Sequence, residues 1–313
     1  MNALPTELLT LVVRWLQPTD AVAVAQTSRQ LAARCAEIVL HRVDVDLSDR
    51  GGQRLARVLR RRFAGVAAVR SHSPVGGVIP FAHVAAAAPA TQQLELWGGS
   101  LGRVPTAAAH LDLQGCTQLA LCPYGWRPRF HWPLERWATA SITTLRLNAW
   151  GGSPAQWTQL IAAVPALVDV GIEECPGFDA ARCGALFDGC RSVRRVQITD
   201  CAPALEYRDV LRAAARKDSL EALEFSRTYA RLEEGGGVTL ADVSGHADTL
   251  QRLRVIGICD SPLPDAVIYW LYENCPRLAL CYSDGRELTH QLAATQRMLH
   301  HPDWCQIVDC LEL

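Results

Sequence analysis

The chain has 313 residues, with 31 basic and 32 acidic side chains and a formal net charge of −1. Hydrophobic residues make up 49% and charged residues 20%, a balance that is usual for globular proteins. This length accommodates one large domain or two ordinary ones and suffices to bury a core. The near-neutral charge argues against a general nucleic-acid-binding protein, whose affinity comes from many basic contacts to phosphates.

Twelve cysteines in a chain of this length do not indicate a secreted disulfide framework. The N-terminus lacks the basic-then-apolar order of a signal peptide, and no apolar stretch approaches the ~20 residues of a membrane span. We therefore expect a reducing aqueous compartment, cytoplasmic or nuclear, and no membrane partner.

Residues 1–41 predict a helical module. Pro5, Thr6 and Glu7 suit a helix start, and the following apolar residues up to Leu16 recur at helical spacing. A break around Pro18 precedes two further short helices, over residues 21–26 and 28–40. A cluster of this size is close to the limit for independent folding.

The segment from Leu4 to Cys35 resembles an F-box, through its Leu-Pro pair, the Glu that follows, the apolar helix ending in Leu and an Asp-containing turn. The resemblance implies docking to a Skp-family adaptor of a cullin–RING ubiquitin ligase. By the same resemblance, the adaptor-binding residues are Leu4, Pro5, Glu7, Leu8, Val12, Leu16 and Val24. The alternative is a plain N-terminal cap that covers the open edge of the first repeat.

Residues 42–286 predict a solenoid that begins with a strand at Arg42 and a basic amphipathic helix over residues 50–62. That helix is either a solvated outer face or a surface for an acidic partner or RNA. Short apolar-x-apolar segments then recur at residues 94–96, 111–113, 145–147, 170–172, 196–198, 223–225, 253–255 and 278–280. The later ones are 25 to 30 residues apart, which is typical of a repeat with one short strand per turn.

Apolar residues at three-to-four spacing predict helices between these strands, over residues 155–163, 179–188, 207–216 and 265–274. The alternation predicts an α/β solenoid with a curved parallel sheet and convex helices. Residues 119–140 read as a Trp- and Pro-rich insertion that either covers the early repeats or anchors a partner. Residues 287–313 read as a C-terminal helical cap.

The repeats resemble the cysteine-containing leucine-rich repeats, through Cys190-x-x-Val193-x-x-Val196-x-Ile198-x-x-Cys201 and Cys275-Pro276-x-Leu278-x-Leu280. Cys116, Cys175 and Cys201 are predicted three residues after a strand, where a small side chain packs in a turn. Cys122 and Cys183 fall outside this pattern, and we expect them to be more exposed.

The concave sheet face of such a solenoid is an extended binding surface. The partner-binding residues predicted there are Glu95, Trp97, Asp112, Gln114, Arg146, Asn148, Glu173, Gln197, Thr199, Glu224 and Arg254. Ile256 is placed beside Arg254, and Trp126 and Trp132 of the insertion are added as possible anchors. An ordinary solvated sheet face is the alternative for any one of them.

No motif for catalysis is present: the chain has no phosphate-binding glycine loop, no Gly-x-Ser-x-Gly turn and no Cys-x-x-Cys pair. We therefore predict no enzyme activity, no metal site and no cofactor. The leading hypothesis is a substrate receptor that docks an adaptor and binds a protein target, with Lys217 as its only lysine. The alternative is a structural or scaffolding subunit of a large protein or ribonucleoprotein assembly.

Overall fold

The computed structural model describes residues 6–16, 18–38, 42–44, 54, 68–72, 78–87, 92–97, 100–101, 113, 115–122, 133–201, 205–226, 239–259, 264–275, 277 and 280–283. The chain divides into two compact units, Met1–Leu167 and Val168–Leu313. The predicted boundaries at residues 41 and 286 stay predictions, and the expected basic helix and C-terminal cap lie outside the described residues, apart from residue 54 in the helix.

The first unit begins with three helices, α1 (Thr6–Arg14), α2 (Pro18–Ala25) and α3 (Arg29–Ile38). Both α1 and α2 pack against α3. Their shared core consists of small and β-branched side chains, including Val13, Val22 and Cys35. Because small side chains let helices approach closely, the Ala-rich second helix that the sequence contains is compatible with this packing.

A parallel sheet follows in the order β1 (Arg42–Asp44), β2 (Ala68–His72), β4 (Gln93–Trp97), β6 (Gln118–Cys122) and β7 (Thr144–Asn148). A second, two-stranded sheet pairs β3 (Val78–Ile79) with β5 (Ser100–Leu101). The helices of this part are α5 (Phe81–Ala87), α6 (Leu134–Trp137) and α7 (Pro154–Ala163).

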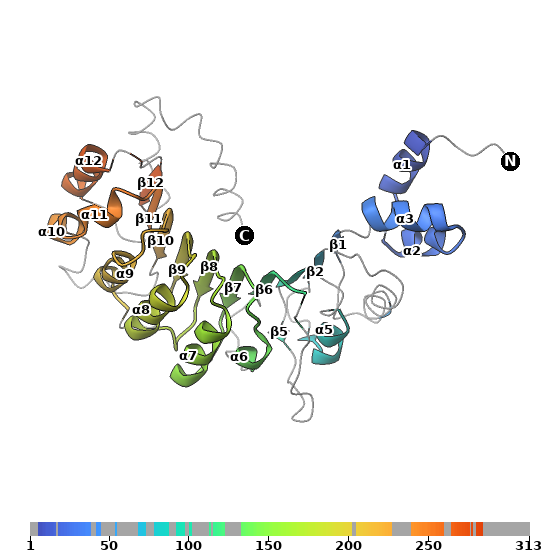
Figure 1. Ribbon diagram of the computed structural model, residues 1–313, viewed down its shortest axis with the longest axis horizontal. Helices are drawn as coiled ribbons and strands as arrows, with labels where there is room; N and C mark the ends of the chain where they lie inside the picture. The colour runs from blue at the N-terminus through green and yellow to red at the C-terminus, as the bar shows by residue number, and fades with distance from the viewer. Residues whose placement is uncertain are drawn as a thin grey trace. The chain divides into compact units, whose positions relative to one another are not determined.

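The second unit alternates strand and helix more regularly. Its parallel sheet has the order β8 (Asp169–Glu173), β9 (Arg195–Thr199), β10 (Ala222–Ser226), β11 (Val255–Cys259) and β12 (Leu280–Ser283). Its helices are α8 (Ala180–Gly189), α9 (Tyr207–Ala214), α10 (Leu240–Ser244), α11 (Ala247–Leu250) and α12 (Asp265–Asn274). These helices line one face of the sheet, and none of the described helices covers the other face (Figure 1).

Each unit is therefore built as the α/β solenoid that the sequence predicts, and the leucine-rich-repeat fold class is confirmed. The four helices expected between strands correspond to α7, α8, α9 and α12. The start of α7 follows from local chemistry: Ser153 accepts a hydrogen bond from the backbone N–H of Gln156, Gln156 reciprocates, and Pro154 occupies the first turn.

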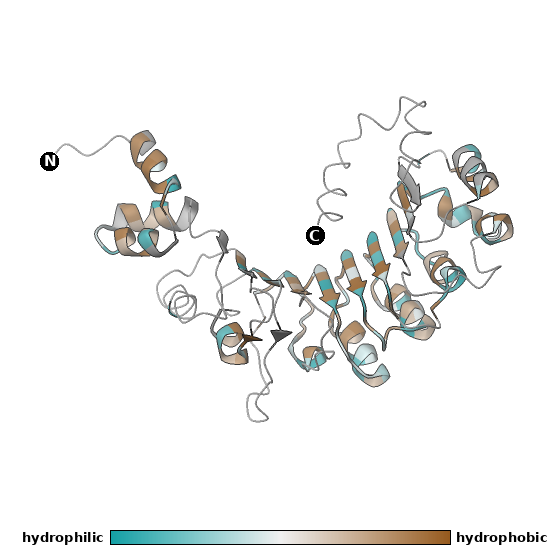
Figure 2. Ribbon diagram, turned by 180° about the vertical axis from the view of Figure 1, so that it is seen from behind, coloured by the Kyte–Doolittle hydropathy of each residue, from teal (hydrophilic) through white to brown (hydrophobic). Residues whose placement is uncertain are grey.

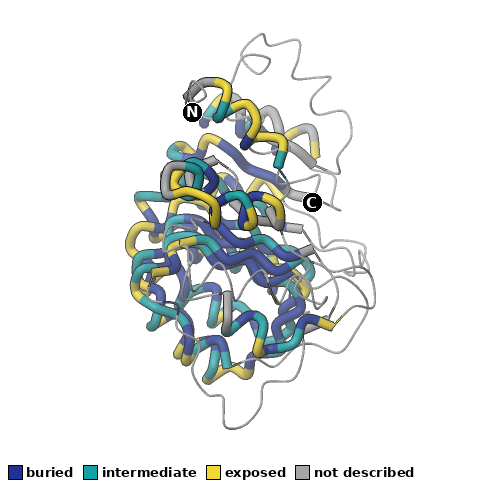
Figure 3. The backbone as a smooth tube through the Cα atoms, turned by 90° about the vertical axis from the view of Figure 1, so that its right-hand side faces the viewer, coloured by how far each residue is buried: buried dark blue, intermediate teal, exposed yellow. Residues whose placement is uncertain are grey.

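The strand register explains the repeat length. In the first unit Val69, Leu94, Leu119 and Leu145 are register partners, 25 or 26 residues apart. In the second unit the equivalent row is Val196, Leu223 and Ile256, all nearly inaccessible to solvent. In Figure 3 the strands run as buried segments and exposed segments lie on helices and turns. The core is the layer between the sheet and its helices.

Residues just before each strand are buried as well. In the second unit one row contains Val193, Leu220 and Leu253, each three residues before the first inward-facing strand residue. Three residues earlier lies a second buried row, at the ends of the helices: Cys190, Lys217, Leu250 and Cys275. The only lysine of the chain thus occupies a position that cysteine or leucine fills in the other repeats, and it is 9% exposed.

Three of the predicted strands were placed wrongly. Of the strand predicted at 111–113 only Leu113 is described, and it is a buried residue that precedes β6 and belongs to no strand. Leu119 and Leu121, which the prediction gave to an insertion, lie in β6. The strands predicted at 253–255 and 278–280 begin later, as β11 and β12. At 253–255 the buried Leu253 of the preceding turn resembled the first apolar residue of a strand.

Eight cysteines have described side chains; all eight are free thiols, and seven of them are buried. Cys122 and Cys183, expected to be more exposed, are 8% and 0% exposed, because Cys122 belongs to β6 and Cys183 lies on the inner face of α8. Cys116 precedes β6 rather than following a strand. Cys201 does follow β9, and its Sγ contacts the carbonyl oxygen of Ile172 at 3.5 Å, so it joins neighbouring repeats.

These thiols are expected to react slowly in the native chain. Burial raises the pKa of Cys116, Cys190 and Cys275 to about 11 and that of Cys201 to about 12. The thiolate is the reactive form, so both access and ionisation oppose reaction at pH 8. Titration with a disulfide reagent should therefore modify at most four of the twelve cysteines within minutes and all twelve in guanidinium, since eight of them are described as free and shielded. Rapid reaction of more than four would contradict this packing.

Candidate functional site

Helix α1 and the residue just beyond its end carry an exposed apolar surface, which we call the α1 stripe: Leu8, Leu11, Val12 and Trp15. Their exposed fractions are 47%, 53%, 57% and 87%. At 100° per residue these positions lie within about 100° of arc on the helix. Val13, on the opposite side, is 1% exposed and packs into the three-helix core. The helix therefore buries one face and presents a second apolar face to solvent. Figure 2 shows that α1 is apolar over most of its length.

The structure places two predicted adaptor-binding residues, Leu8 and Val12, together on the α1 stripe. Leu16 follows the helix and Val24 lies on α2, and both are half-buried. Leu4 and Pro5 lie outside the described residues. For Glu7 the structure describes the backbone, which belongs to α1, but not the side chain. Sequence reasoning assigned Leu11 and Trp15 to the helix but not to the surface, although their spacing from Leu8 was the available signal.

In the first unit the predicted binding residues Glu95 and Trp97 belong to one hydrogen-bonded network. The carboxylate of Glu95 accepts from Arg70 Nε at 2.6 Å, from Gln93 Nε2 at 2.9 Å and from Trp97 Nε1 at 3.1 Å. Gln93 also donates to Gln118 on the next strand. Because Glu95 is only 8% exposed and already accepts three hydrogen bonds, it fixes its neighbours rather than offering a free charge.

Arg146 and Asn148, on β7, are half-buried on the same polar rows of the first unit. Asp112, Gln114, Trp126 and Trp132 lie outside the described residues, so their predicted roles stay predictions. Trp137, from the same predicted insertion, is 2% exposed and its ring packs against Phe81 at 5.3 Å between centroids. This tryptophan therefore stabilises the core.

The open sheet face of the second unit is polar and mixed in charge. Glu173 is exposed, and Gln197, Thr199 and Glu224 are half-buried on the outward positions of β8, β9 and β10. The sequence prediction missed a pair on the same face, in which Arg195 Nη2 lies 3.0 Å from Asp169 Oδ2. The two residues are register partners on neighbouring strands, as in cross-strand charge pairs.

Arg254 and Ile256 do not lie where the prediction put them. Arg254 is exposed but precedes β11, and Ile256 is 1% exposed and points into the core. The prediction placed this strand at 253–255, whereas β11 begins at Val255. Because successive side chains of a strand point to opposite faces, Ile256 lies on the core face and not on the open face where the prediction put it. Arg254 therefore belongs to the edge of the sheet where the strands begin.

At the opposite edge, where β8 and β9 end, three acidic side chains come together: Glu173, Glu174 and Asp200. Glu174 and Asp200 directly follow their strands and have φ of 48° and 46°, in the left-handed region, as does Ala149 after β7. The backbone N–H of Glu174 donates to Thr199 O at 2.9 Å, which fixes this turn against the next strand. Partial burial, and then the charges of Glu173 and Asp200, raise the pKa of Glu174.

Replacing Glu174 with glutamine should therefore stabilise the protein at pH 7. A carboxyl whose folded-state pKa is raised favours folding below its ordinary pKa of 4.5, and this contribution is lost as pH rises through the folded-state pKa. We expect the thermal midpoint of Glu174→Gln to exceed that of the wild type at pH 7, with the difference vanishing near pH 4. Glu273→Gln, at an exposed glutamate of α12, is the matched control. An increase that persists at pH 4 would show that charge is not the cause.

Within the described ranges, no group of three His, Cys, Asp or Glu side chains could hold a metal ion. No helix in that part of the chain is both long and apolar enough to cross a membrane. What the described surfaces offer is therefore an apolar helical stripe and two polar sheet faces, one in each unit. These are features that bind other macromolecules, and open solenoid faces are used for protein binding.

Comparison with known proteins gives no family assignment: no protein-family model and no curated protein sequence matches the chain. Similar solved structures include a TLR13–ssRNA13 complex, with 11% identity and a TM-score of 0.44, and a protein from Bacteroides fragilis, with 15% identity and a TM-score of 0.41. They cover 84% and 78% of this chain, whereas this chain spans 36% and 65% of theirs. Both TM-scores lie below 0.5, so the fold rests on the strands and helices described above.

Proposed function

We propose that this chain is a non-enzymatic substrate receptor of a cullin–RING ubiquitin ligase. In this proposal the α1 stripe docks a Skp-family adaptor, and the open sheet faces of the solenoid bind a protein target. The observation that carries the proposal is the α1 stripe, in combination with the F-box resemblance of the segment that contains it.

The α1 stripe has the physical character of a docking surface. Fully burying a leucine or valine side chain releases roughly 1.5–3 kcal/mol, and tryptophan has a larger surface to bury. The four residues are spaced like the anchors that an amphipathic helix places in a hydrophobic groove. Burying them against a partner would therefore contribute a substantial free energy of binding. Trp15 is the most exposed of them and belongs to the residue type most enriched at binding hot spots.

The sheet faces support the second half of the proposal. Their outward residues mix acidic, basic and amide side chains, a composition suited to steering and orienting a protein partner. Lys217, the only lysine, is buried at a helix end. A receptor of this kind would therefore present little side-chain amine to its own ligase.

Co-purification tests the proposal directly. We expect the full chain, co-expressed with a Skp-family adaptor and the N-terminal part of a cullin, to elute with both as one complex on size exclusion. If the three proteins elute separately at micromolar concentration while the chain itself is folded, the adaptor-docking claim is wrong.

The alternative, a permanent scaffolding subunit, was motivated by the insertion at 119–140 and the basic helix at 50–62. Most of both segments lies outside the described residues, and the described part of 119–140 forms β6 and α6. This alternative stays a prediction, and no described contact favours it over the receptor.

A further inference from the structure

Lys217 is the only lysine among the 31 lysine and arginine residues of the chain. Arginine guanidinium groups stay protonated, so they are poor nucleophiles, and acylation of a side-chain amine in this sequence can occur only at Lys217. The residue is 9% exposed, at a position that cysteine or leucine fills in the neighbouring repeats. The surroundings of this one side chain therefore decide whether the chain accepts an acyl group on a lysine.

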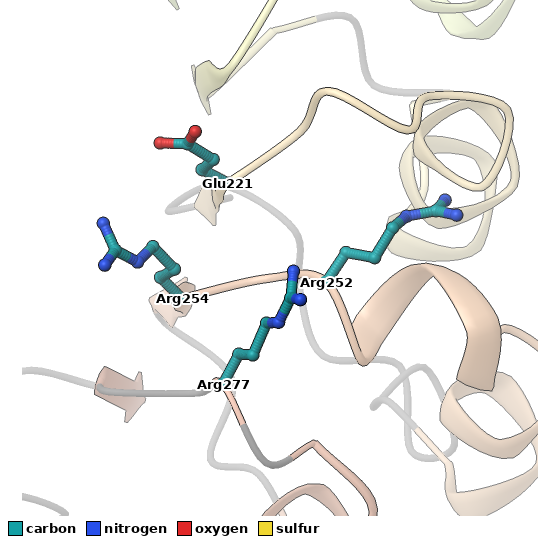
Figure 4. A pocket seen from close by; sticks show the side chains of 4 residues that line it. All are labelled: Glu221, Arg252, Arg254 and Arg277. Atoms are coloured by element: carbon teal, nitrogen blue, oxygen red, sulfur yellow. The ribbon is translucent and has the colours of Figure 1, made fainter.

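The turn that follows α9 holds Lys217 through its backbone. The N–H of Lys217 donates to Ala214 O at 2.9 Å, which continues the last turn of the helix. From the next repeat, Arg252 Nη2 donates to Lys217 O at 3.4 Å, and Arg252 Nη1 lies 2.8 Å from Asp218 Oδ1. Figure 4 shows the Arg252 side chain extending away from Arg254. Arg252 thus fixes the turn after α9 by two contacts that cross from one repeat to the next.

The ammonium group of Lys217 has no carboxylate partner among the described residues, since Asp218 pairs with Arg252. Its nearest titratable neighbour is a thiol of the preceding repeat. Burial raises the pKa of Cys190 to about 11, and the positive charge of Lys217 opposes that shift, so the ammonium group lies near this thiol. The two residues occupy equivalent positions in neighbouring repeats, given the register of β9 and β10.

A lysine at this position favours local opening of the turn. Removing an ammonium group from water without a charged partner is unfavourable, and opening of the turn restores its hydration. The neighbouring repeats carry Cys190 and Leu250 at the same position, and opening would instead expose a thiol or an alkyl group to water. Native proteins open locally without unfolding globally. We therefore expect the turn after α9 to open more often than the equivalent turns of its neighbours.

We propose that Lys217 is a ubiquitin acceptor that the native fold shields and that local opening of the turn after α9 makes available. In the transfer, the deprotonated Nζ attacks the carbonyl carbon of a ubiquitin thioester. The carbon–sulfur bond breaks, an amide bond forms, the thiol of the conjugating enzyme leaves and the proton of the amine goes to water. The native receptor is thus spared by its own ligase, and a receptor with a loosened turn becomes its substrate. The identity of the acyl group rests on the proposed function; the shielding of the amine does not.

Acetylation of the full chain alone, without adaptor, tests the shielding. The reagent is sulfo-N-hydroxysuccinimide acetate at pH 8, and mass spectrometry quantifies each site. Arg212→Lys adds an exposed lysine on α9 as a reference in the same molecule. We expect Lys217 to react at least about tenfold more slowly than position 212 in the native chain, and as fast as position 212 in guanidinium.

Arg252→Gln, combined with the reference lysine, tests the opening of the turn. It removes both contacts that cross to the turn after α9, so we expect Lys217 to react about tenfold faster, at an unchanged rate for position 212. Arg208→Gln is the matched control, because it makes the same change in net charge at an exposed arginine of α9. It should leave the Lys217 rate unchanged. Both variants are assayed well below their thermal midpoints, so that global unfolding does not contribute.

Equal native rates at Lys217 and position 212, or an equal acceleration in Arg252→Gln and Arg208→Gln, would overturn the shielding. The ubiquitin step is then measured in the assembled ligase with activating and conjugating enzymes. Arg252→Gln should gain ubiquitin on Lys217 and the wild type should not; equal modification of the two, or none in Arg252→Gln, would overturn the acceptor role. Failure of the proposed function is separable, because a chain that binds no adaptor would keep the same acetylation rates and lose only ubiquitin as the acyl group.

Discussion

Replacing Trp157 with alanine is expected to lower the free energy of unfolding by about 3–5 kcal/mol. Trp157 is 1% exposed in the middle of α7, and its ring meets that of Trp150 edge-on at 4.7 Å between centroids. Alanine is the best helix former, so the loss reflects packing rather than helix propensity. The surroundings cannot collapse easily, since even a methyl group at Gly152 would lie 2.6 Å from the Trp150 ring.

The matched control is Trp15→Ala. Trp15 is 87% exposed and lies just beyond the end of α1, so its removal should change the free energy of unfolding by less than about 0.5 kcal/mol. Urea denaturation followed by circular dichroism measures both variants. Equal destabilisation by the two substitutions would contradict the burial assigned to Trp157 and the exposure assigned to the α1 stripe.

The double variant Leu8→Asp/Trp15→Asp is expected to weaken adaptor binding at least about 100-fold. Each substitution removes an apolar anchor and places a charge in the interface, which costs about 2 kcal/mol or more per hot-spot position. The helix itself should persist, because an aspartate at position 8, in the first turn of α1, interacts favourably with the helix dipole and offsets the unfavourable interaction of the aspartate at position 15, just beyond the C-terminal end. The measurement is adaptor affinity by biolayer interferometry.

Leu240→Asp controls for a general effect of replacing an exposed leucine by aspartate. Leu240 is the first residue of α10 in the second unit and is 44% exposed, close to the 47% of Leu8. It should leave adaptor affinity within about twofold of the wild type. A comparable loss in Leu240→Asp, or an undiminished affinity in the double variant, would show that the α1 stripe does not mediate docking.

Periodicity accounts for most of what the sequence could predict about the fold. The strands at Leu145, Val170 and Val196 were located because each alternates clearly and is followed by a helix with its own spacing. The strand at Leu223 was located by its alternation alone, and the short helices α10 and α11 that follow it were not predicted. The repeat length then specified a parallel sheet with helices on one face. β2 escaped notice because alanine, arginine and serine weaken its alternation.

The misplaced strands have a common physical cause. The turn from helix to strand buries a residue every three positions, as Cys190, Val193 and Val196 illustrate. Leu113 and Leu253 are such buried residues, so the pair that ends at Leu113 and the pair that begins at Leu253 each resemble a strand by chance. Only the hydrogen-bonded register, which depends on the neighbouring strand, distinguishes the two positions.

The candidate surfaces were predicted unevenly for the same reason. The F-box resemblance named Leu8 and Val12, which are half of the α1 stripe, whereas the helical spacing that adds Leu11 and Trp15 was not used to place them on a surface. The ion pair of Arg195 and Asp169 could not be found this way, because it depends on the register of two neighbouring strands. Likewise, the three hydrogen bonds that Glu95 accepts come from residues of two strands, β2 and β4. Because its carboxylate is already hydrogen-bonded, Glu95 is not the free binding residue that its position in the sequence indicated.

Hydrogen–deuterium exchange of the full chain with saturating Skp-family adaptor tests the central claim most directly. The account predicts slower exchange over residues 6–16, which contain the α1 stripe, and unchanged exchange over residues 240–250 of the second unit. A complex that forms without protecting residues 6–16, or the absence of any complex, would contradict it.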